Sequence, residues 1–506
     1  MNSIFMFIAV LIPVISAILI PVFNFKEERT RNIYIEGALL ITSVIVCLLI
    51  FNIPAGDFVF ARFTRSLSLS LRIDGMSRIF AGLAAFMWPL ATLYAFEYME
   101  KEKSDIFFMF YTMTYGVTLG ISFAEDIFTM YFFYELLTLV TVPLVMHTLT
   151  REAVLASRTY LYYSLGGAGF AFIGMVFIIS YSVDINFRYG GVLSLLRVQG
   201  RENVLLLIYV LSFLGFGVKS AIFPLGAWLP RASVAPTPVT ALLHAVAVVN
   251  AGAFAIIRLT WFSFGTDFLK GTWAQRVVMG FAIVTILYSS TRAVKETHIK
   301  RRLAWSTSSN LSYILFGVTL MNPGGLMGAL LHFVIHGIMK ICSFFCAGAI
   351  IHRTEKNYVH ELDGLAKRMP KVFLMFTASA LSLMGVPGFA GFVSKWYLAA
   401  AAVSADGDAE SYAGIAALLI SALLTAIYMM TMLVRGYFPE KGSEMLSSDR
   451  AGRHSGDTES GTADDKLLDP GFRMMVPLIV FAALVIILGL FPGPLISFVR
   501  SAIYTR

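Results

Sequence analysis

Residues 215–239 read GFGVKSAIFPLGAWLPRASVAPTPV, and this stretch decides the fold. Lys219 stands inside an apolar run long enough to cross a bilayer, and prolines follow it from Pro224 onward. A proline removes a backbone hydrogen bond, and unwound backbone at membrane depth is tolerated only beside protein or a watery cavity. The stretch therefore predicts a broken transmembrane helix that carries a charge near the break.

The composition of the whole chain agrees with a membrane protein. Of its 506 residues, 58% are hydrophobic and only 14% are charged, whereas a soluble chain carries about 25% charged residues. This excludes a soluble multi-domain enzyme. The three cysteines lie in apolar runs, which excludes a disulfide scaffold. We assign the net charge of +8 to cytoplasmic loops rather than to a nucleic-acid partner.

Apolar runs of about 20 residues predict an all-α polytopic membrane protein with about fourteen transmembrane helices. The predicted spans are residues 3–23, 33–53, 75–98, 106–124, 127–147, 158–182, 204–228, 237–262, 275–293, 303–320, 324–351, 370–401, 411–435 and 474–495. The first span lacks a small-residue cleavage site, so we expect a retained helix rather than a signal peptide. Residues 183–203 are predicted as an interfacial amphipathic piece, and residues 439–470 as a polar, loosely held loop.

Basic residues favour the loops that follow odd-numbered helices. They include Lys26, Arg29, Arg31, Lys101, Lys103, Arg292, Lys295, Lys300, Arg301, Arg302, Arg353, Lys356, Lys367, Arg368, Lys371, Arg435 and Lys441. The loops after the second, sixth and eighth helices also carry some basic residues. Most basic loop residues nevertheless follow odd-numbered helices. This bias predicts that these odd-to-even loops are cytoplasmic and that both termini lie outside the cell inner (plasma) membrane.

Four charged residues inside predicted spans stand out: Glu135, Lys219, Lys340 and Lys395. A charge at the centre of a spanning helix costs about 2.5–3.5 kcal/mol on insertion scales, so each is a functional hypothesis. One acid and three bases on separate helices are suited to a buried proton relay, because a desolvated lysine can take up and release protons. The alternative is a set of static ion pairs, or lysines that snorkel to an interface.

Two histidines, His332 and His336, share a helical face at a spacing that a metal could use. No cysteine or carboxylate pattern completes a metal site, and haem would need an opposing histidine. We therefore predict no metal and no cofactor, and treat these histidines as packed or relay side chains.

A second interrupted segment lies in the other half of the chain. Gly385-Val386-Pro387-Gly388 precedes Lys395. Two lysine-bearing segments, broken near Pro224 and Pro387, suggest internal repeats with ion sites at the breaks. Two ordinary proline kinks are the alternative.

The motif in residues 216–239 resembles the signature of antiporter-like subunits. These subunits occur in respiratory complex I, in Mrp-type sodium/proton antiporters and in membrane-bound hydrogenase-type complexes. Supporting matches are Glu125-Asp126-Ile127, residues 299–307 (IKRRLAWST), His336-x-x-x-Lys340 and Gly391-Phe392-Val393-Ser394-Lys395. The lysine at position 395 makes the chain most similar to the Mrp D-type subunit.

The resemblance implies two inverted five-helix repeats, helices 4–8 and 9–13, with helices 7 and 12 broken. The corresponding segments are residues 1–105 (helices 1–3), 106–262 and 263–435 (the two repeats), 436–473 (a polar cytoplasmic loop) and 474–506 (helix 14). It also implies a proton relay through Glu135, Lys219, His244, Asn250, His336, Lys340 and Lys395. In that relay Glu135 pairs with Lys219, and Lys395 is the exit residue.

The chain departs from the family pattern at two positions. Many relatives have a lysine where Asn250 stands, and Asn250 cannot carry a proton, although it can hydrogen-bond water. Arg231 replaces the usual aspartate after Trp228-Leu229-Pro230, which leaves the ion pairing of that loop open.

The leading functional hypothesis is an ion-translocating subunit without a redox centre of its own. It would belong to an NADH dehydrogenase- or hydrogenase-type oxidoreductase or to an Mrp antiporter, and would move protons or, alternatively, sodium. Its expected partners are other membrane subunits, including further antiporter-like ones, and the lipid bilayer. A stand-alone solute transporter, a redox membrane enzyme and a structural spacer are the competing classes.

Overall fold

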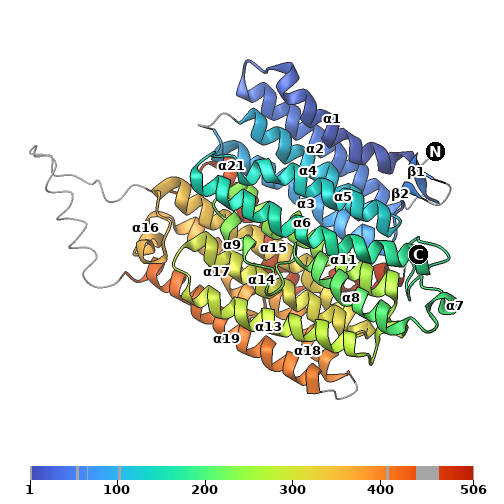
Figure 1. The fold of residues 1–506 in the computed structure, drawn as a ribbon. Helices are drawn as coiled ribbons and strands as arrows, with labels where there is room; N and C mark the ends of the chain where they lie inside the picture. The colour runs from blue at the N-terminus through green and yellow to red at the C-terminus, as the bar shows by residue number, and fades with distance from the viewer. Residues whose placement is uncertain are drawn as a thin grey trace, which may run out of the picture.

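The computed structural model describes residues 3–52, 56–64, 67–100, 104–405, 409–439 and 467–504. Its helices lie side by side in one bundle, and each predicted span is occupied by a helix or by a broken helix (Figure 1). Eleven helical segments within these ranges are long and apolar enough to cross a membrane. The polytopic helical fold predicted from the sequence is confirmed.

The unbroken spanning helices follow the apolar runs closely. They are α1 (Ile4–Phe23), α2 (Glu28–Phe51), α3 (Gly75–Tyr98), α4 (Asp105–Phe123), α5 (Ile127–Val145), α6 (Arg151–Tyr181), α13 (Trp273–Lys295), α14 (Ile299–Thr319), α15 (Pro323–Thr354), α19 (Ala409–Tyr437) and α21 (Phe472–Leu490). Capping residues set several starts: Asp126 accepts a bond from the backbone N–H of Thr129 before α5, and Asn322 accepts one from Gly325 before α15.

The two segments with prolines or glycines are broken, as expected. The seventh span divides into α8 (Glu202–Gly217) and α9 (Trp228–Ala232), with Pro224 in the unwound part. The twelfth span divides into α17 (Pro370–Met384) and α18 (Ala390–Val403), with Pro387 between them. Gly385 and Gly388 have φ of +87° and +90°, a region that side chains rarely allow, so these two glycines make the turn possible.

The eighth span predicted over 237–262 is present as Thr237–Phe264, but it is also broken, which the sequence does not predict. It consists of α10 (Thr237–Ala245), α11 (Val248–Ile257) and the π-helix η1 (Arg258–Phe264). No proline or glycine stands at the break. Instead the Asn250 side chain donates to the carbonyl of Ala245, at 2.9 Å, and supplies the partner that a continuous helix would have provided.

Several short elements lie outside the predicted spans. They are the antiparallel strands β1 (Phe58–Arg62) and β2 (Ser68–Leu71), the helices α7 (Leu195–Val198), α12 (Thr266–Leu269), α16 (Leu365–Arg368) and α22 (Gly493–Tyr504), and the 3₁₀ turn η2 (Val359–Leu362). The hairpin makes the all-α prediction incomplete. α7 lies in the predicted interfacial piece, and its Leu195 and Leu196 are more than four-fifths exposed. The predicted polar loop 439–470 lies outside the described residues except at 439 and 467–470.

Both chain ends lie at one end of the bundle, and α16 lies at the other (Figure 1). α14 and α15 run through its centre, and every residue of α14 except Arg301 is buried. A helix this polar and this buried must satisfy its side chains within the protein. The buried polar face of α14 is therefore a candidate functional site.

The end with the two termini is closed by contacts around the α4–α5 link. The backbone N–H of Glu125 donates to Ser70 in β2, and its carbonyl accepts from Phe187. Its carboxylate accepts from the Asn186 side chain at 2.9 Å. Burial, followed by the charge of Asp57, raises the Glu125 pKa to about 7.

This raised pKa predicts a pH-dependent stability. An acid whose pKa is 4.5 when unfolded and about 7 when folded loses stability as pH rises through that interval. We expect Glu125→Gln, which stays neutral, to melt a few degrees above the parent protein at pH 8 and to match it near pH 4.5. Thermal unfolding of the purified complex at both pH values measures this.

Glu361→Gln is the matched control, with the opposite sign. Burial opposes the charge of Glu361, but hydrogen bonds from the backbone N–H groups of Tyr358 and Asn357 outweigh it and lower its pKa. Removing that carboxylate should lower the melting temperature at pH 8. An equal shift for both variants would contradict the assignment.

Candidate functional site

The unwound segment between α8 and α9 places Lys219 in the protein interior. The lysine is 1% exposed, and its amino group donates to the backbone carbonyl of Tyr134 on α5 and lies 3.4 Å from the centre of the Tyr134 ring. The Tyr134 hydroxyl in turn donates to the carbonyl of Phe216 at the end of α8. These contacts hold α5 against the break.

Glu135, the residue after Tyr134, is half-buried on the same helix. Its charge and that of Lys219 are close enough to interact. In the described part of the chain the Lys219 ammonium nevertheless has a main-chain partner rather than a direct ion pair, and Oε1 of Glu135 is buried without a hydrogen-bond partner. The structure thus brings the two predicted residues together without locking them.

The break beside Lys219 opens onto a small cavity of about 40 Å³. Ser289, Ser308 and Ala221 contribute to its lining, and the Ser308 hydroxyl donates to the Ala221 carbonyl at 2.8 Å. A water needs roughly 10–15 Å³ of such space, so the cavity has room for a few waters beside polar groups. Unwound backbone beside a polar cavity is the arrangement that a membrane interior tolerates.

His244 and Asn250 lie on the two halves of the broken eighth span, and both are fully buried. Asn250 caps the end of α10, while its carbonyl oxygen Oδ1 has no partner. Both ring nitrogens of His244 also lack partners, and its ring packs against Phe344 of α15. These free donors and acceptors can exchange hydrogen bonds with water or with a neighbouring side chain.

Lys340 and His336 lie one turn apart on α15, and neither is exposed. The Lys340 amino group donates to the Leu303 carbonyl at 3.1 Å and to the Ser306 hydroxyl, both on α14. Both His336 ring nitrogens are buried without partners. Lys340 is within electrostatic range of both His336 and His244.

Lys395 on α18 reaches back to the end of α17. Its amino group donates to the carbonyls of Leu383 and Met384, at 2.6 and 3.1 Å. The last carbonyls of a helix have no intrahelical partner and carry its negative partial charge, so they suit a cation. The broken helix thus creates the acceptors that hold the lysine.

Sequence reasoning singled out His332 as a packed or relay histidine but missed Tyr313 and Ser394, which lie with it between Lys395 and the centre. His332 Nδ1 is 2.8 Å from the hydroxyl of Ser394, and the His332 and His336 rings are 6.0 Å apart. The Tyr313 ring lies 5.3 Å from His332 and 5.5 Å from the Lys395 ammonium. The one sequence signal was a run of hydroxyl and amide residues, 306–313, inside an apolar-spaced helix.

The predicted residues therefore form two groups. The first group consists of Glu135 and Lys219. The second consists of His244, His336, Lys340 and Lys395. Within the second group, the charge of Lys340 acts on both histidines and the charge of Lys395 acts on Lys340. Asn250 lies beside both groups, because α11 packs against the Lys219 break: the Ser220 hydroxyl donates to the Val249 carbonyl at 3.3 Å. Within the described ranges, no three His, Cys, Asp or Glu side chains gather as a metal ion would require.

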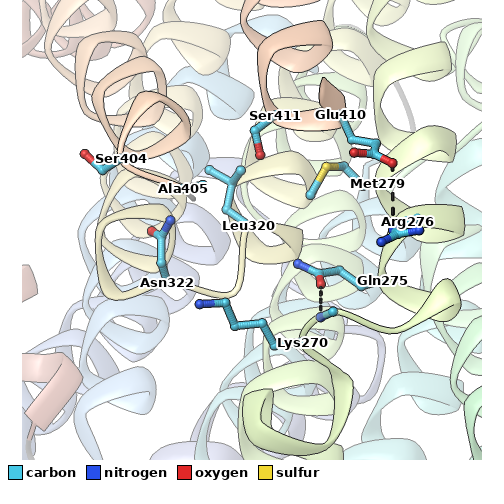
Figure 2. A pocket seen from close by; sticks show the side chains of 11 residues that line it. Lys270, Gln275, Arg276, Met279, Leu320, Asn322, Ser404, Ala405, Glu410 and Ser411 are labelled. Atoms are coloured by element: carbon cyan, nitrogen blue, oxygen red, sulfur yellow. Dashed lines mark hydrogen bonds and ion pairs between the residues drawn. The ribbon is translucent and has the colours of Figure 1, made fainter. Parts of the chain in front are cut away.

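A larger pocket of about 240 Å³ lies at the end of the bundle where α13 and α19 begin and α14 and α18 end. Lys270, Gln275, Arg276, Asn322 and Glu410 line it from several directions (Figure 2). Arg276 and Glu410 approach to 3.8 Å across its rim. It is a polar opening above the helices that carry Lys395 and Tyr313.

This arrangement of broken helices and buried lysines has known counterparts. The family described as "NADH:quinone oxidoreductase/Mrp antiporter, TM" matches residues 124–425. The chain belongs to this family. The family predicted from the motifs is confirmed, and the matched region contains every residue of the two groups.

Relatives of the family cover most of the chain. The sequence is 30% identical over 444 residues to NADH-quinone oxidoreductase subunit N of Desulforudis audaxviator (strain MP104C), spanning 85% of this chain and 83% of that protein. It is 28% identical over 454 residues to one of the subunits of the Na(+)/H(+) antiporter of Alkalihalophilus pseudofirmus, spanning 84% of this chain and 53% of that protein.

Two solved structures share the fold. One is the membrane-bound sulfane sulfur reductase, an archaeal respiratory membrane complex, with a TM-score of 0.82 at 22% identity over 98% of this chain and 96% of that one. The other is the Mrp complex from Dietzia sp. DQ12-45-1b, with a TM-score of 0.80 at 23% identity over 99% and 96%. The chain therefore shares its fold with a subunit of each of these two membrane complexes.

The break at Ala245 yields a prediction about Asn250. Asn250→Leu removes the donor to the Ala245 carbonyl, and an unsatisfied buried acceptor costs about 1–3 kcal/mol. We expect this variant to lower the thermal stability of the complex clearly. Asn250→Lys, which keeps a hydrogen-bond donor at this position, should be tolerated.

Thermal unfolding of both variants, measured with subunit content, provides the comparison. Equal loss of stability in the lysine and leucine variants would mean that the amide fills a dry, tightly packed space. The path between the two groups would then have to be redrawn through His244.

Proposed function

We propose that the chain is an ion-translocating subunit of a multi-subunit membrane complex. It moves protons along Glu135, Lys219, His244, His336, Lys340 and Lys395, with water and Asn250 bridging the two groups. The observation that carries this proposal is that buried Lys219 and Lys340 and half-buried Lys395, from three different spans, all hydrogen-bond to backbone carbonyls or a hydroxyl. Partner subunits supply the free energy that drives proton movement. These partners are membrane subunits like those in the complexes of the chain's relatives.

Carbonyl partners suit a lysine that must change charge. An amine donates hydrogen bonds whether it is protonated or neutral, so a carbonyl accepts from both forms. A carboxylate partner would instead stabilise the ammonium form strongly. Lys340 and Lys395 also repel one another when both are charged, which favours passing a proton over holding two.

Lys219 of the first group and Lys395 of the second occupy corresponding places in the two proposed repeats, residues 106–262 and 263–435, whereas His244 of the second group lies on the last span of the first repeat. In each repeat, the fourth span is broken and a lysine contacts a carbonyl near the break. This parallel supports the division that the resemblance implied. Helices α1 to α3 and the C-terminal α21 flank the repeats.

We propose further that the end of the bundle with the two termini faces the outside of the cell. The opposite end carries the larger share of the arginine and lysine residues around α13, α14 and α16, as cytoplasmic loops do. The 240 Å³ pocket then opens outward above Lys395, where translocated ions leave.

The first group predicts the behaviour of paired variants. Glu135→Gln and Lys219→Ala should each reduce coupled ion transport by about 10²-fold or more, the usual contribution of a positioned acid or base. The double variant should be no worse than either single one, because both residues act in one step. Transport into vesicles that contain the native complex, normalised to assembled subunit, measures these rates.

Glu152→Gln is the control, since Glu152 is an exposed acid paired with Arg301 on the surface. It should transport normally. Additive losses in the double variant, with assembly verified, would show that Glu135 and Lys219 work independently.

Lys395 provides a separate test of the second group. Lys395→Ala leaves the carbonyls of Leu383 and Met384 without their donor and removes the last base of the path. We expect transport to be abolished while the subunits stay assembled. Lys371→Ala, at the exposed start of α17, is the control. Normal transport by an assembled Lys395→Ala complex would refute the role of Lys395.

A further inference from the structure

One buried lysine has no place in the proposed relay. Lys300 lies in the first turn of α14, is 7% exposed, and donates to the backbone carbonyl of Ala235 at 2.9 Å. Its neighbours point elsewhere: Arg301 pairs with Glu152 at 2.6 Å, and Arg302 donates to two other carbonyls. Among the described residues, no carboxylate forms an ion pair with Lys300. It thus resembles Lys340 and Lys395 in having a main-chain acceptor.

A half-buried histidine lies between Lys300 and the surface. His298 precedes α14, and its backbone pairs with Tyr358 in an isolated β-bridge that fixes its position. Its Nδ1 atom is buried without a partner. Burial, followed by the charges of Lys300 and Arg301, lowers the His298 pKa to about 4. The ring is therefore neutral near pH 7, with one nitrogen able to accept a proton and the other able to donate one.

Toward the centre of the bundle, the charge of Lys300 interacts with a member of the second group. This charge is within range of His244, which is also within range of Lys340. Burial rises along this series, from half-buried His298 through Lys300 to fully buried His244 and Lys340. The four side chains thus influence one another in series while their burial increases.

We propose that His298 and Lys300 form the proton uptake site of this protein. The site lies at the end of the bundle where α14 begins. This proposal rests on the function proposed above and extends the path to the surface. The Lys300 ammonium gives a proton to His244 through water and becomes a neutral amine. The amine then takes a proton from one nitrogen of His298, while the other nitrogen takes one from surface water. These transfers leave Lys300 protonated and His298 as its other neutral tautomer, and rotation of the ring returns the proton to the inner nitrogen before the next cycle.

A purely structural role for Lys300 makes a different prediction. If Lys300 serves only to hold the Ala235 carbonyl, Lys300→Arg should substitute well, because arginine keeps the positive charge and the donors. If Lys300 passes protons, arginine should fail, because it stays protonated throughout the physiological range. The conservative variant therefore separates the two roles.

The test uses the intact complex in vesicles and measures the initial rate of proton uptake with a pH-sensitive dye at pH 7. We expect Lys300→Arg and Lys300→Gln to lower the rate by about tenfold or more, and His298→Gln to lower it severalfold. Lys295→Gln and Lys367→Gln, exposed charges at the same end, should stay near the parental rate. Subunit content is measured for each variant.

A parental rate in assembled Lys300→Arg would overturn the proposal and leave Lys300 a structural residue. A parental rate in His298→Gln would equally overturn the part assigned to the histidine. Lys219→Ala, measured in parallel, separates these failures from that of the proposed function. If Lys219→Ala also transports normally, the relay itself is wrong; if it is inactive while the Lys300 variants transport normally, only the uptake site is wrong.

Discussion

The pairing of buried polar side chains with backbone carbonyls is the interaction on which this structure depends. Each interruption of a helix inside a membrane leaves carbonyls that cannot bond to water. Asn250 bonds the carbonyl at the end of α10, Ser308 bonds that of Ala221, and Lys395 bonds those at the end of α17. The breaks and the polar residues therefore stabilise one another, and neither could be kept without the other.

This mutual requirement also explains why α14 is so polar. It lies between the two broken spans, where one side meets the unwound backbone after Lys219 and another meets Lys340. Its hydroxyl residues serve as small donors that fit between closely packed helices. A more apolar α14 would leave the Ala221 carbonyl and the Lys340 amino group without these partners. The helix is thus the element that couples the two halves of the molecule.

Much of the architecture can be predicted from the sequence, because span length and proline or glycine positions are local signals. The apolar run predicts a first span at 3–23 and the helix is Ile4–Phe23, and the breaks near Pro224 and Pro387 follow from those residues alone. The break after Ala245 could not be expected, since a side chain five residues beyond it bonds the freed carbonyl. Such a contact depends on tertiary geometry rather than on a local preference.

The site shows the same division between local and distant information. Intramembrane charge identifies Glu135, Lys219, Lys340 and Lys395 without coordinates, because charges in apolar runs are rare. What each lysine contacts is not predictable, and in place of the expected ion pair with Glu135 the Lys219 amino group has a main-chain bond at Tyr134. Neutral partners such as Ser306 leave no charge signature in a sequence. They emerge only when helices distant in the chain are placed together.

The position of the break between α17 and α18 has an electrical consequence. The two halves have 15 and 14 residues, which at about 1.5 Å per residue makes each roughly 21–22 Å long. The break therefore falls near the middle of a hydrocarbon layer about 30 Å thick. A proton that reaches Lys395 from either side crosses about half of the transmembrane voltage, worth roughly 1.2 kcal/mol per 100 mV. In the proposed relay, the membrane potential therefore acts directly on how often Lys395 takes up a proton from each side.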